Sequence, residues 1–241
     1  FTTGTTGKSK GIKIVYRNNV AIAQNVSEAI GITNDDVEMV TAPMNHSMAL
    51  RRTYTVFYKG GTVVLTDGVK FIEDFFKLLD MYNVTGLTFA PAILEQLLKF
   101  AKDRFGTYSD RLRYIQLGSA PLSEKAKETL KEMFPNTKLF NIYGATESGC
   151  TVSLEFSKYG DKKGSIGKPN VNAEIINIQN FDEVMGDILK QIENIPDDII
   201  KYLNTKMPKA TFPPLPSKGK NFPVLRMNAL PILEYPLNCK L

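Results

Sequence analysis

The chain has 241 residues, of which 43% are apolar, 23% charged and 10% aromatic, a composition typical of globular proteins rather than disordered or fibrous ones. Lysine and arginine exceed aspartate and glutamate by 30 to 25, and this surplus is spread along the chain, so we expect no nucleic-acid partner. Two cysteines and one histidine exclude a disulfide framework and a multi-histidine zinc site.

No apolar run approaches the roughly 20 residues of a membrane span, and the N-terminus lacks the pattern of a signal peptide. We therefore expect a cytoplasmic protein without a membrane span. The chain opens inside a glycine motif with no preceding strand or helix cap. We expect the natural polypeptide to extend beyond these residues.

The apolar pattern predicts alternating strands and helices over the first 145 residues. The expected strands are 38–42, 62–66, 84–89, 113–117 and 139–143, and residues 12–16 are expected to form a strand or the approach to one. The expected helices are 20–31, 47–58 capped by Ser47, 70–82, 93–100 and one capped by Ser123 that runs to 134. This alternation favours right-handed crossovers and a parallel sheet, with ligands at the carboxyl ends of the strands.

The sequence changes in character after residue 150. Residues 164–167 and 173–178 indicate a β-rich piece, and residues 197–205 a helix, whereas residues 206–241 are rich in proline and show no clear period. We expect a smaller second part at this end of the chain.

The first motif with chemical content is the run Phe1-Thr-Thr-Gly-Thr-Thr-Gly-Lys-Ser-Lys-Gly11. Gly7-Lys8-Ser9 imitates the end of a Walker A loop, but Thr2 stands where that motif needs its first glycine, which excludes it. A loop rich in glycine, hydroxyls and lysine can present donors to phosphate oxygens. The alternative is a flexible glycine–threonine linker.

The second motif, Asn141-Ile-Tyr-Gly-Ala-Thr-Glu147, follows a predicted strand. Tyr143 can stack on a base, Thr146 can bond a phosphate, and Glu147 offers the hard oxygen ligand that Mg²⁺ prefers. The alternative is a polar turn in which the threonine caps a helix.

Four motifs together resemble those of the adenylate-forming (AMP-binding) superfamily, and in particular its acyl-CoA synthetases and carboxylate–CoA ligases. The first run is similar to the phosphate loop [ST]-[ST]-G-T-[ST]-G-x-P-K-G, and Tyr143-Gly-Ala-Thr-Glu147 to Y-G-x-T-E. Gly118-Ser-Ala-Pro-Leu122 is similar to G-G-A-P-L, and Gly164-Ser-Ile-Gly-Lys-Pro169 to G-S-V-G-x-P. All four occur in the family's order.

The resemblance implies an α/β fold with the parallel-sheet βαβ core of the adenylate-forming N-terminal domain, followed by a β-rich piece and a truncated α+β tail. It places the AMP-binding core, without the family's N-terminal segment, at residues 1–195. Residues 196–241 are reminiscent of the small C-terminal domain.

The resemblance also implies roles for individual residues. Pyrophosphate would be cradled by Thr2, Thr3, Gly4, Thr5, Thr6, Gly7 and Lys10. The rest of the nucleotide would lie against Gly118, Ser119, Ala120, Asn141, Tyr143, Gly144 and Ala145. Thr146 would contact the α-phosphate, Glu147 would hold Mg²⁺, and Lys240 would contact the developing transition state. Lys10, Thr146, Glu147 and Lys240 are thus the expected catalytic residues, and His46 the expected residue of the acyl pocket.

The implied activity joins a carboxylic acid to a thiol in two steps. The carboxylate attacks the α-phosphate of ATP to give an acyl-adenylate, and coenzyme A or a carrier thiol then displaces AMP. His46, together with the absence of the F-D-x-S sequence usual in amino-acid-activating members, favours a fatty, aryl or similar acid.

Several departures from the family pattern keep a second hypothesis open. Ser9 replaces a proline, Cys239 stands where a glycine precedes the lysine, and the T-G-D and G-R-x-D-x-x-K motifs are missing. Met185-Gly-Asp187 looks more like part of the preceding G-E-[IL] strand than a T-G-D remnant. The alternatives are therefore a non-catalytic or truncated nucleotide-binding fragment, and for Lys240 a surface lysine at a terminus.

Overall fold

The structure is a computed structural model that describes residues 11–66, 68–69, 71–160, 162, 164–177 and 223–227. The predicted phosphate loop, the helix predicted at 197–205, Lys240 and the domain boundary predicted at residue 195 all lie outside the described residues. The predicted core of alternating strands and helices lies within them.

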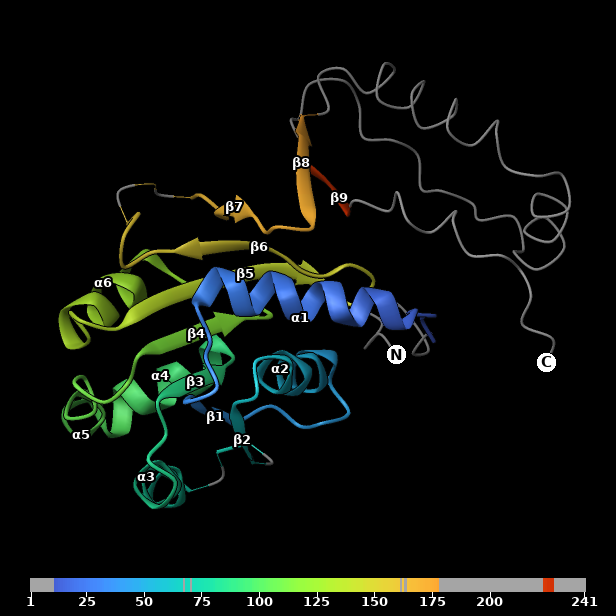
Figure 1. The fold of residues 1–241 in the computed structure, drawn as a ribbon. Coiled ribbons are helices and arrows are strands. Elements are labelled where there is room, and N and C mark those ends of the chain that lie inside the picture. The colour runs from blue at the N-terminus through green and yellow to red at the C-terminus, as the bar shows by residue number, and fades with distance from the viewer. Residues whose placement is uncertain are drawn as a thin grey trace, which may run out of the picture. The chain divides into compact units, whose positions relative to one another are not determined.

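A mostly parallel sheet forms the centre of the described part of the chain (Figure 1). Its seven strands are β1 (Val37–Val40), β2 (Thr62–Leu65), β3 (Gly86–Phe89), β4 (Tyr114–Gly118), β5 (Lys138–Ala145), β6 (Gly149–Glu155) and β7 (Lys168–Pro169). They lie in the order β2-β1-β3-β4-β5-β6-β7, and β1 to β5 are mutually parallel, whereas β6 and β7 pair antiparallel. The predicted α/β fold with a parallel sheet is confirmed.

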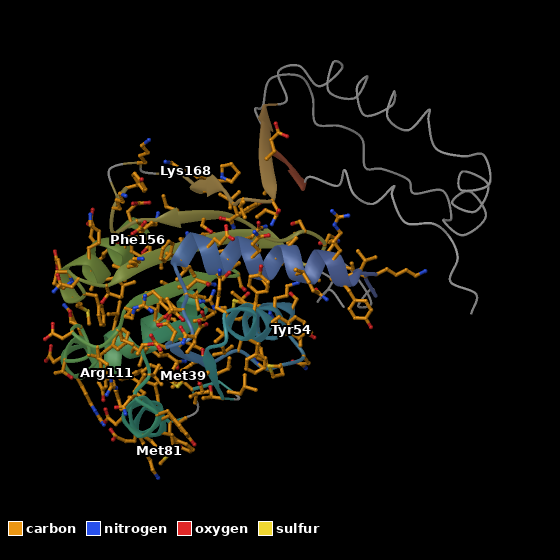
Figure 2. The ribbon with its side chains drawn as sticks, in the orientation of Figure 1. Met39, Tyr54, Met81, Arg111, Phe156 and Lys168 are labelled. Atoms are coloured by element: carbon orange, nitrogen blue, oxygen red, sulfur yellow. The ribbon has the colours of Figure 1, made fainter. Side chains whose placement is uncertain are left out.

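Helices cover both faces of this sheet. They are α1 (Tyr16–Ile30), α2 (Ser47–Tyr58), α3 (Ile72–Met81), α4 (Pro91–Phe100), α5 (Lys102–Gly106) and α6 (Glu124–Met133). Ser123 caps α6 as predicted, since its Oγ accepts a hydrogen bond from the Ala126 N–H at 3.2 Å. Figure 2 shows Met39 of β1 enclosed by other side chains, whereas Tyr54 of α2 and Met81 of α3 lie at the surface.

Alternation along the central strands divides the apolar residues between the two faces. Ile115 and Leu117 of β4 pack into a large cluster with residues of α3 to α6, such as Phe76 and Leu130. Tyr114 of β4 packs instead with residues of α1 and β5, in a smaller cluster of Val26, Ile30, Ile32, Phe140 and Ile142. Successive side chains of a strand point to opposite faces, so α3 to α6 cover one face, and α1, with α2 beside it (Figure 1), the other.

Residues 12–16, predicted to be a strand or the approach to one, do not form a strand. Residues 11–15 have no regular secondary structure, and α1 begins at Tyr16. Ile12 and Ile14 do alternate like strand residues, but they line a cavity with Leu50 and Tyr54 of α2 instead of pairing with a strand. Helix α1 ends where Gly31 adopts a left-handed φ of 77° and donates its N–H to the Ser27 carbonyl.

A separate sheet pairs β8 (Ala173–Asn177) with β9 (Pro223–Met227). The described residues 175–177 and 223–226 belong to a second unit, distinct from the unit that contains the large sheet. The strand predicted at 173–178 is thereby confirmed over its described residues.

Asp36 joins three elements at the amino end of the sheet. Its buried carboxylate accepts hydrogen bonds from Thr33 N–H at 2.8 Å, from Thr85 Oγ at 2.9 Å and from the Arg113 guanidinium. Burial alone would raise the pKa of Asp36, but the Arg113, Thr33 and Thr85 interactions outweigh it and hold that pKa below its usual value.

We expect Asp36 to make stability depend on pH on the acid side. Because its folded-state pKa is depressed, the unfolded chain takes up the proton first, so stability falls as pH drops below about 4. Asp36→Asn should reduce the free energy of unfolding at pH 7 and flatten its decline between pH 5 and pH 3, measured by urea denaturation. The exposed neighbour provides the control Asp35→Asn, and an equal flattening in both variants would contradict the assignment.

Glu38 is the buried acid at the centre of β1. Its carboxylate accepts hydrogen bonds from Arg52 of α2 (Nη2 to Oε2, 2.6 Å), from Thr88 Oγ of β3 at 2.7 Å and from the Tyr114 hydroxyl of β4 at 2.7 Å. Burial alone would lower the pKa of Arg52, but the negative charge and the hydrogen bonds of Glu38 outweigh burial and raise that pKa. Burial and the Glu38 charge also raise the pKa of Tyr114, so its hydroxyl stays a donor.

Replacing Glu38 should be among the most damaging single changes in the sheet. Glu38→Gln leaves the buried Arg52 charge uncompensated, which costs about 3–5 kcal/mol of stability. Glu73→Gln is the matched control, because Glu73 pairs with Arg104 at the exposed surface of α3 and such pairs contribute little. Similar shifts of the two variants in chemical denaturation would show that the Glu38 ion pair is not structurally important.

Candidate active site

Two cavities lie side by side at the carboxyl ends of β4 and β5. The α2 cavity, of about 220 Å³, is lined by His46, Ser47, Met48, Arg51, Gln116, Gly118, Ser119, Ile142, Gly144, Ala145, Thr146, Gly149 and Cys150. The α6 cavity, of about 420 Å³, is lined by Ser119, Ala120, Pro121, Leu122, Glu124, Lys127, Asn141, Ile142, Tyr143, Gly144, Gly164, Ser165 and Ile166. Ser119, Ile142 and Gly144 belong to both walls.

The two cavities divide the predicted site residues between them. The α6 cavity brings together the predicted adenine contacts Ser119, Ala120 and Tyr143 with the G-S-I-G motif. The predicted acyl-pocket residue His46 lines instead the α2 cavity, as do Gly118, Ala145 and Thr146, which were predicted to contact the nucleotide. Motifs that are separate in the sequence therefore meet at one edge of the sheet, as expected for strand ends of a parallel sheet.

Ser119 has an unusual backbone conformation where the two cavities meet. Its φ of 69° lies in the left-handed region, which costs free energy for a residue with a side chain. This turn directs the chain away from the end of β4, and the Ser119 Oγ donates to the Met48 sulfur at 3.1 Å. The resulting contact joins the end of β4 to the first turn of α2.

The second motif forms the end of a β-hairpin. Residues Gly144 and Ala145 belong to β5 and pair with Cys150 and Gly149 of β6, so the predicted loop is reduced to a turn at 146–148. A side chain at Gly144 would place its Cβ 1.9 Å from the Gly149 carbonyl oxygen, so the close pairing of these strands requires glycine. The register shifts between Tyr143 and Gly144, and Tyr143 is 50% exposed.

Arg51 holds this hairpin in place and was not among the predicted site residues. Its buried guanidinium donates from Nη1 to the Ala145 carbonyl at 3.1 Å and from Nη2 to the Thr146 carbonyl. Burial lowers the pKa of Arg51, and the negative charge of Glu147 opposes this effect. A sequence signal existed, because two consecutive arginines interrupt the otherwise apolar and hydroxyl pattern of 47–58.

His46, rather than Ser47, is the capping residue of α2. Its Nδ1 accepts the hydrogen bond of the Met48 N–H at 3.2 Å, while Ser47 is the first residue of the helix. An imidazole that accepts at Nδ1 carries its proton on Nε2 when neutral. His46 thus combines a capping contact with a position in the wall of the α2 cavity.

Glu147 lies exposed in the hairpin turn. Among the described residues no three His, Cys, Asp or Glu side chains cluster closely enough to enclose a metal ion. A single exposed carboxylate nonetheless fits Mg²⁺, which proteins bind through one or two carboxylates together with substrate phosphates and water. Glu147 would supply that one protein ligand.

Thr146 also lines a third cavity of about 200 Å³ with Ile12 and Ile14. These residues directly follow the predicted phosphate loop, whose members Thr2 to Gly7 and Lys10 lie outside the described residues. The turn at 146–148 and the residues next to the predicted phosphate loop therefore line the same cavity.

Comparison with known proteins identifies the family. A family model described as AMP-binding enzyme matches residues 1–188, most of the chain. The chain belongs to the AMP-binding enzyme family. The matched range contains the first three motifs and the G-S-I-G motif, all in the family's order.

Individual relatives agree with this assignment. The chain is 30% identical over 184 residues to 4-coumarate-CoA ligase 1 of Narcissus pseudonarcissus, covering 73% of this chain and 33% of that protein. It is 30% identical over 179 residues to acyl-CoA synthetase 7 of Caenorhabditis elegans, covering 70% and 32%. It thus spans about a third of the length of these relatives.

A solved structure shows the same fold. The o-succinylbenzoate coenzyme A synthetase of Bacillus subtilis, in complex with ATP and magnesium ion, superposes with a TM-score of 0.63 at 28% identity, over 72% of this chain and 35% of that one.

Within the described residues no helix has the length and apolar character needed to cross a bilayer.

We expect Arg51 to control the order of the hairpin turn. Arg51→Gln removes the paired donors to Ala145 and Thr146, so the amides of residues 144–150 should exchange with solvent faster. Hydrogen–deuterium exchange with mass spectrometry measures this directly. Phe57→Ala on the exposed side of α2 is the control, and unchanged exchange in Arg51→Gln would show that the guanidinium does not hold the turn.

Proposed function

We propose that this protein is part of an acid–thiol ligase that activates a carboxylic acid with ATP to an acyl-adenylate and transfers the acyl group to a thiol, coenzyme A in the first instance. The observation that carries the proposal is the pair of adjoining cavities at the ends of β4 and β5. The α6 cavity is lined by the residues expected to bracket the adenine, and the α2 cavity, beside His46, offers a space for an acid.

The adjoining walls suit a reaction between two bound molecules. Ser119, Ile142 and Gly144 line both cavities, so a carboxylate in the α2 cavity and an α-phosphate at the shared wall would lie next to each other. Holding two reactants in contact lowers the entropic part of the barrier. In this proposal Tyr143, Ser119 and Ala120 bracket the adenine. Asn141 and Gly144 of the α6 cavity complete the nucleotide site, together with Gly118 and Ala145, which line the adjoining α2 cavity.

The reaction joins two anions and therefore needs positive charge and hydrogen-bond donors near the phosphates. We assign Thr146 to the α-phosphate, Glu147 to Mg²⁺, and Thr2, Thr3, Gly4, Thr5, Thr6, Gly7 and Lys10 to the pyrophosphate. Support comes from Arg51, whose buried guanidinium orients the Ala145–Thr146 backbone, and from the shared space of Thr146 and the residues after the loop.

Three further assignments belong to the same proposal. The core at 1–195 would bind the nucleotide and the acid, and the tail at 196–241 would bring Lys240 to the transition state. The acid would be fatty, aryl or similar, as the names of 4-coumarate-CoA ligase 1 and acyl-CoA synthetase 7 suggest for those relatives. The cytoplasmic location stays a prediction.

Glu147→Gln tests the assignment of the magnesium ligand. The substitution keeps the shape of the side chain and removes the charge that Mg²⁺ prefers, so ATP–pyrophosphate exchange should fall at least about tenfold. Stability should change by no more than about 0.5 kcal/mol, because Glu147 lies exposed in a turn. Exchange is measured across a panel of carboxylic acids with increasing Mg²⁺.

The control is Glu132→Gln, which removes the same charge from an exposed position of α6. It should leave both exchange and stability unchanged. If Glu147→Gln retained full exchange at limiting Mg²⁺, or lost stability in proportion to exchange, the carboxylate would have a structural role and the proposed magnesium ligand would be wrong.

A further inference from the structure

Lys127 is a lysine on the inward face of α6. It is the fourth residue of that helix, and Leu130 and Phe134, which follow on the same face, pack into the large apolar cluster. Lys127 therefore faces the sheet, and only 6% of the residue is exposed. An apolar side chain would continue this face of α6 without the cost of burying a charge, so packing alone does not account for the lysine.

The charge of Lys127 is paired with Glu124 in the preceding turn. The Lys127 Nζ donates to Glu124 Oε1 at 2.8 Å, and the two side chains are 7% and 40% exposed. The ammonium thus lies next to a carboxylate that is open to solvent, and both residues line the α6 cavity. An ammonium has three N–H donors, and among the described residues Glu124 is its one hydrogen-bond acceptor. A ligand in the α6 cavity can therefore accept a further hydrogen bond from Lys127.

The surroundings of Lys127 indicate which part of a nucleotide it would meet. Tyr143 of β5 lies on the same side of the sheet as α6, because Leu139 of that strand packs into the cluster of α6. Thr146 and the residues after the predicted phosphate loop line the third cavity, which has no described lining residue in common with the α6 cavity. A nucleotide with its phosphates at Thr146 and its base on Tyr143 thus presents the base, rather than the phosphates, to Lys127.

We propose that Lys127 is a specificity-determining residue for the base, whose ammonium donates a hydrogen bond to a ring nitrogen of adenine while Glu124 orients it. This inference rests on the proposed function, since it assigns the α6 cavity to the base. The amino group of adenine is a donor and its ring nitrogens are acceptors. An ammonium, which can only donate, therefore binds a ring nitrogen.

Deaza analogues of ATP test the proposal on the unmodified protein. 7-Deaza-ATP and 1-deaza-ATP each replace one ring nitrogen by a C–H group and keep the amino group. The affinities of ATP and both analogues are measured by calorimetry with Mg²⁺, and ATP–pyrophosphate exchange is measured separately. At least one analogue should bind about tenfold more weakly than ATP, because it lacks the acceptor of a hydrogen bond from a charged donor.

Lys127→Met should abolish this difference, since methionine continues the apolar face of α6 and has no N–H donor. ATP should then bind as weakly as the analogue. Lys125→Met is the matched control, because it removes the same charge from an exposed position of the same helix. The preference for ATP over the analogue should persist in that variant.

Chemical acetylation tests the contact without a variant. The protein is treated with acetic anhydride, and the modified lysines are located by mass spectrometry. Adenosine at saturation should slow the acetylation of Lys127, whereas tripolyphosphate, which lacks the base, should not. Acetylation of the exposed Lys125 should change with neither.

Equal binding of ATP and both analogues, a difference that survives in Lys127→Met, or no nucleotide binding at all would overturn the inference. Acetylation of Lys127 that is absent from the free protein, or that adenosine leaves unchanged, would overturn it as well. If the preference for ATP is present and is lost in Lys127→Met, but no carboxylic acid supports pyrophosphate exchange, the base contact stands and the proposed function fails. The analogues and the acetylation need no variant, so the test does not depend on the folding of Lys127→Met.

Discussion

The buried carboxylate of Glu38 is the interaction on which the rest of the structure depends. It is bound at once by α2, β3 and β4 through Arg52, Thr88 and Tyr114. A carboxylate buried in the middle of a sheet is stable only when its charge and lone pairs are satisfied. The position of α2 on the sheet is therefore set by this ion pair as well as by apolar packing.

This constraint extends to the candidate site through the adjacent residue. Arg52 binds the core, and Arg51 binds the carbonyl groups of the β5–β6 hairpin. The beginning of the same helix carries His46 and Met48, which line the α2 cavity. One helix thus links the centre of the sheet to the turn that contains Thr146 and Glu147. The positions of these residues therefore depend on the Glu38 carboxylate of β1, which is three strands away from β5 in the sheet.

Much of this arrangement was predictable from the sequence, because it rests on local patterns. Apolar periodicity gave the helices and the parallel strands, and the strand ends in turn located the loops at Gly118 and Gly144. The strand alternative for residues 12–16 was wrong, since Ile12 and Ile14 line a cavity with residues of α2 and do not pair with a strand. The capping role of His46 was assigned to Ser47, a difference of one residue that sequence preference alone does not resolve.

The interactions that sequence patterns missed are those between distant residues. Arg51 is 95 residues from Thr146, and Glu38 is 76 residues from Tyr114. Neither pairing has a local spacing rule. Gln116 likewise is a single polar residue in an apolar strand, and only the fold shows that its side-chain oxygen is buried without a donor among the described residues.

The wall shared by the two cavities has a thermodynamic consequence. Ser119, Ile142 and Gly144 form part of both, and Ser119 is held in a left-handed conformation. A molecule that shifts or rigidifies this wall from one side changes the surface that a second molecule meets on the other. Linkage requires that effect to be reciprocal, so the affinities of the two cavities for their occupants should not be independent, and each should report on the occupancy of the other.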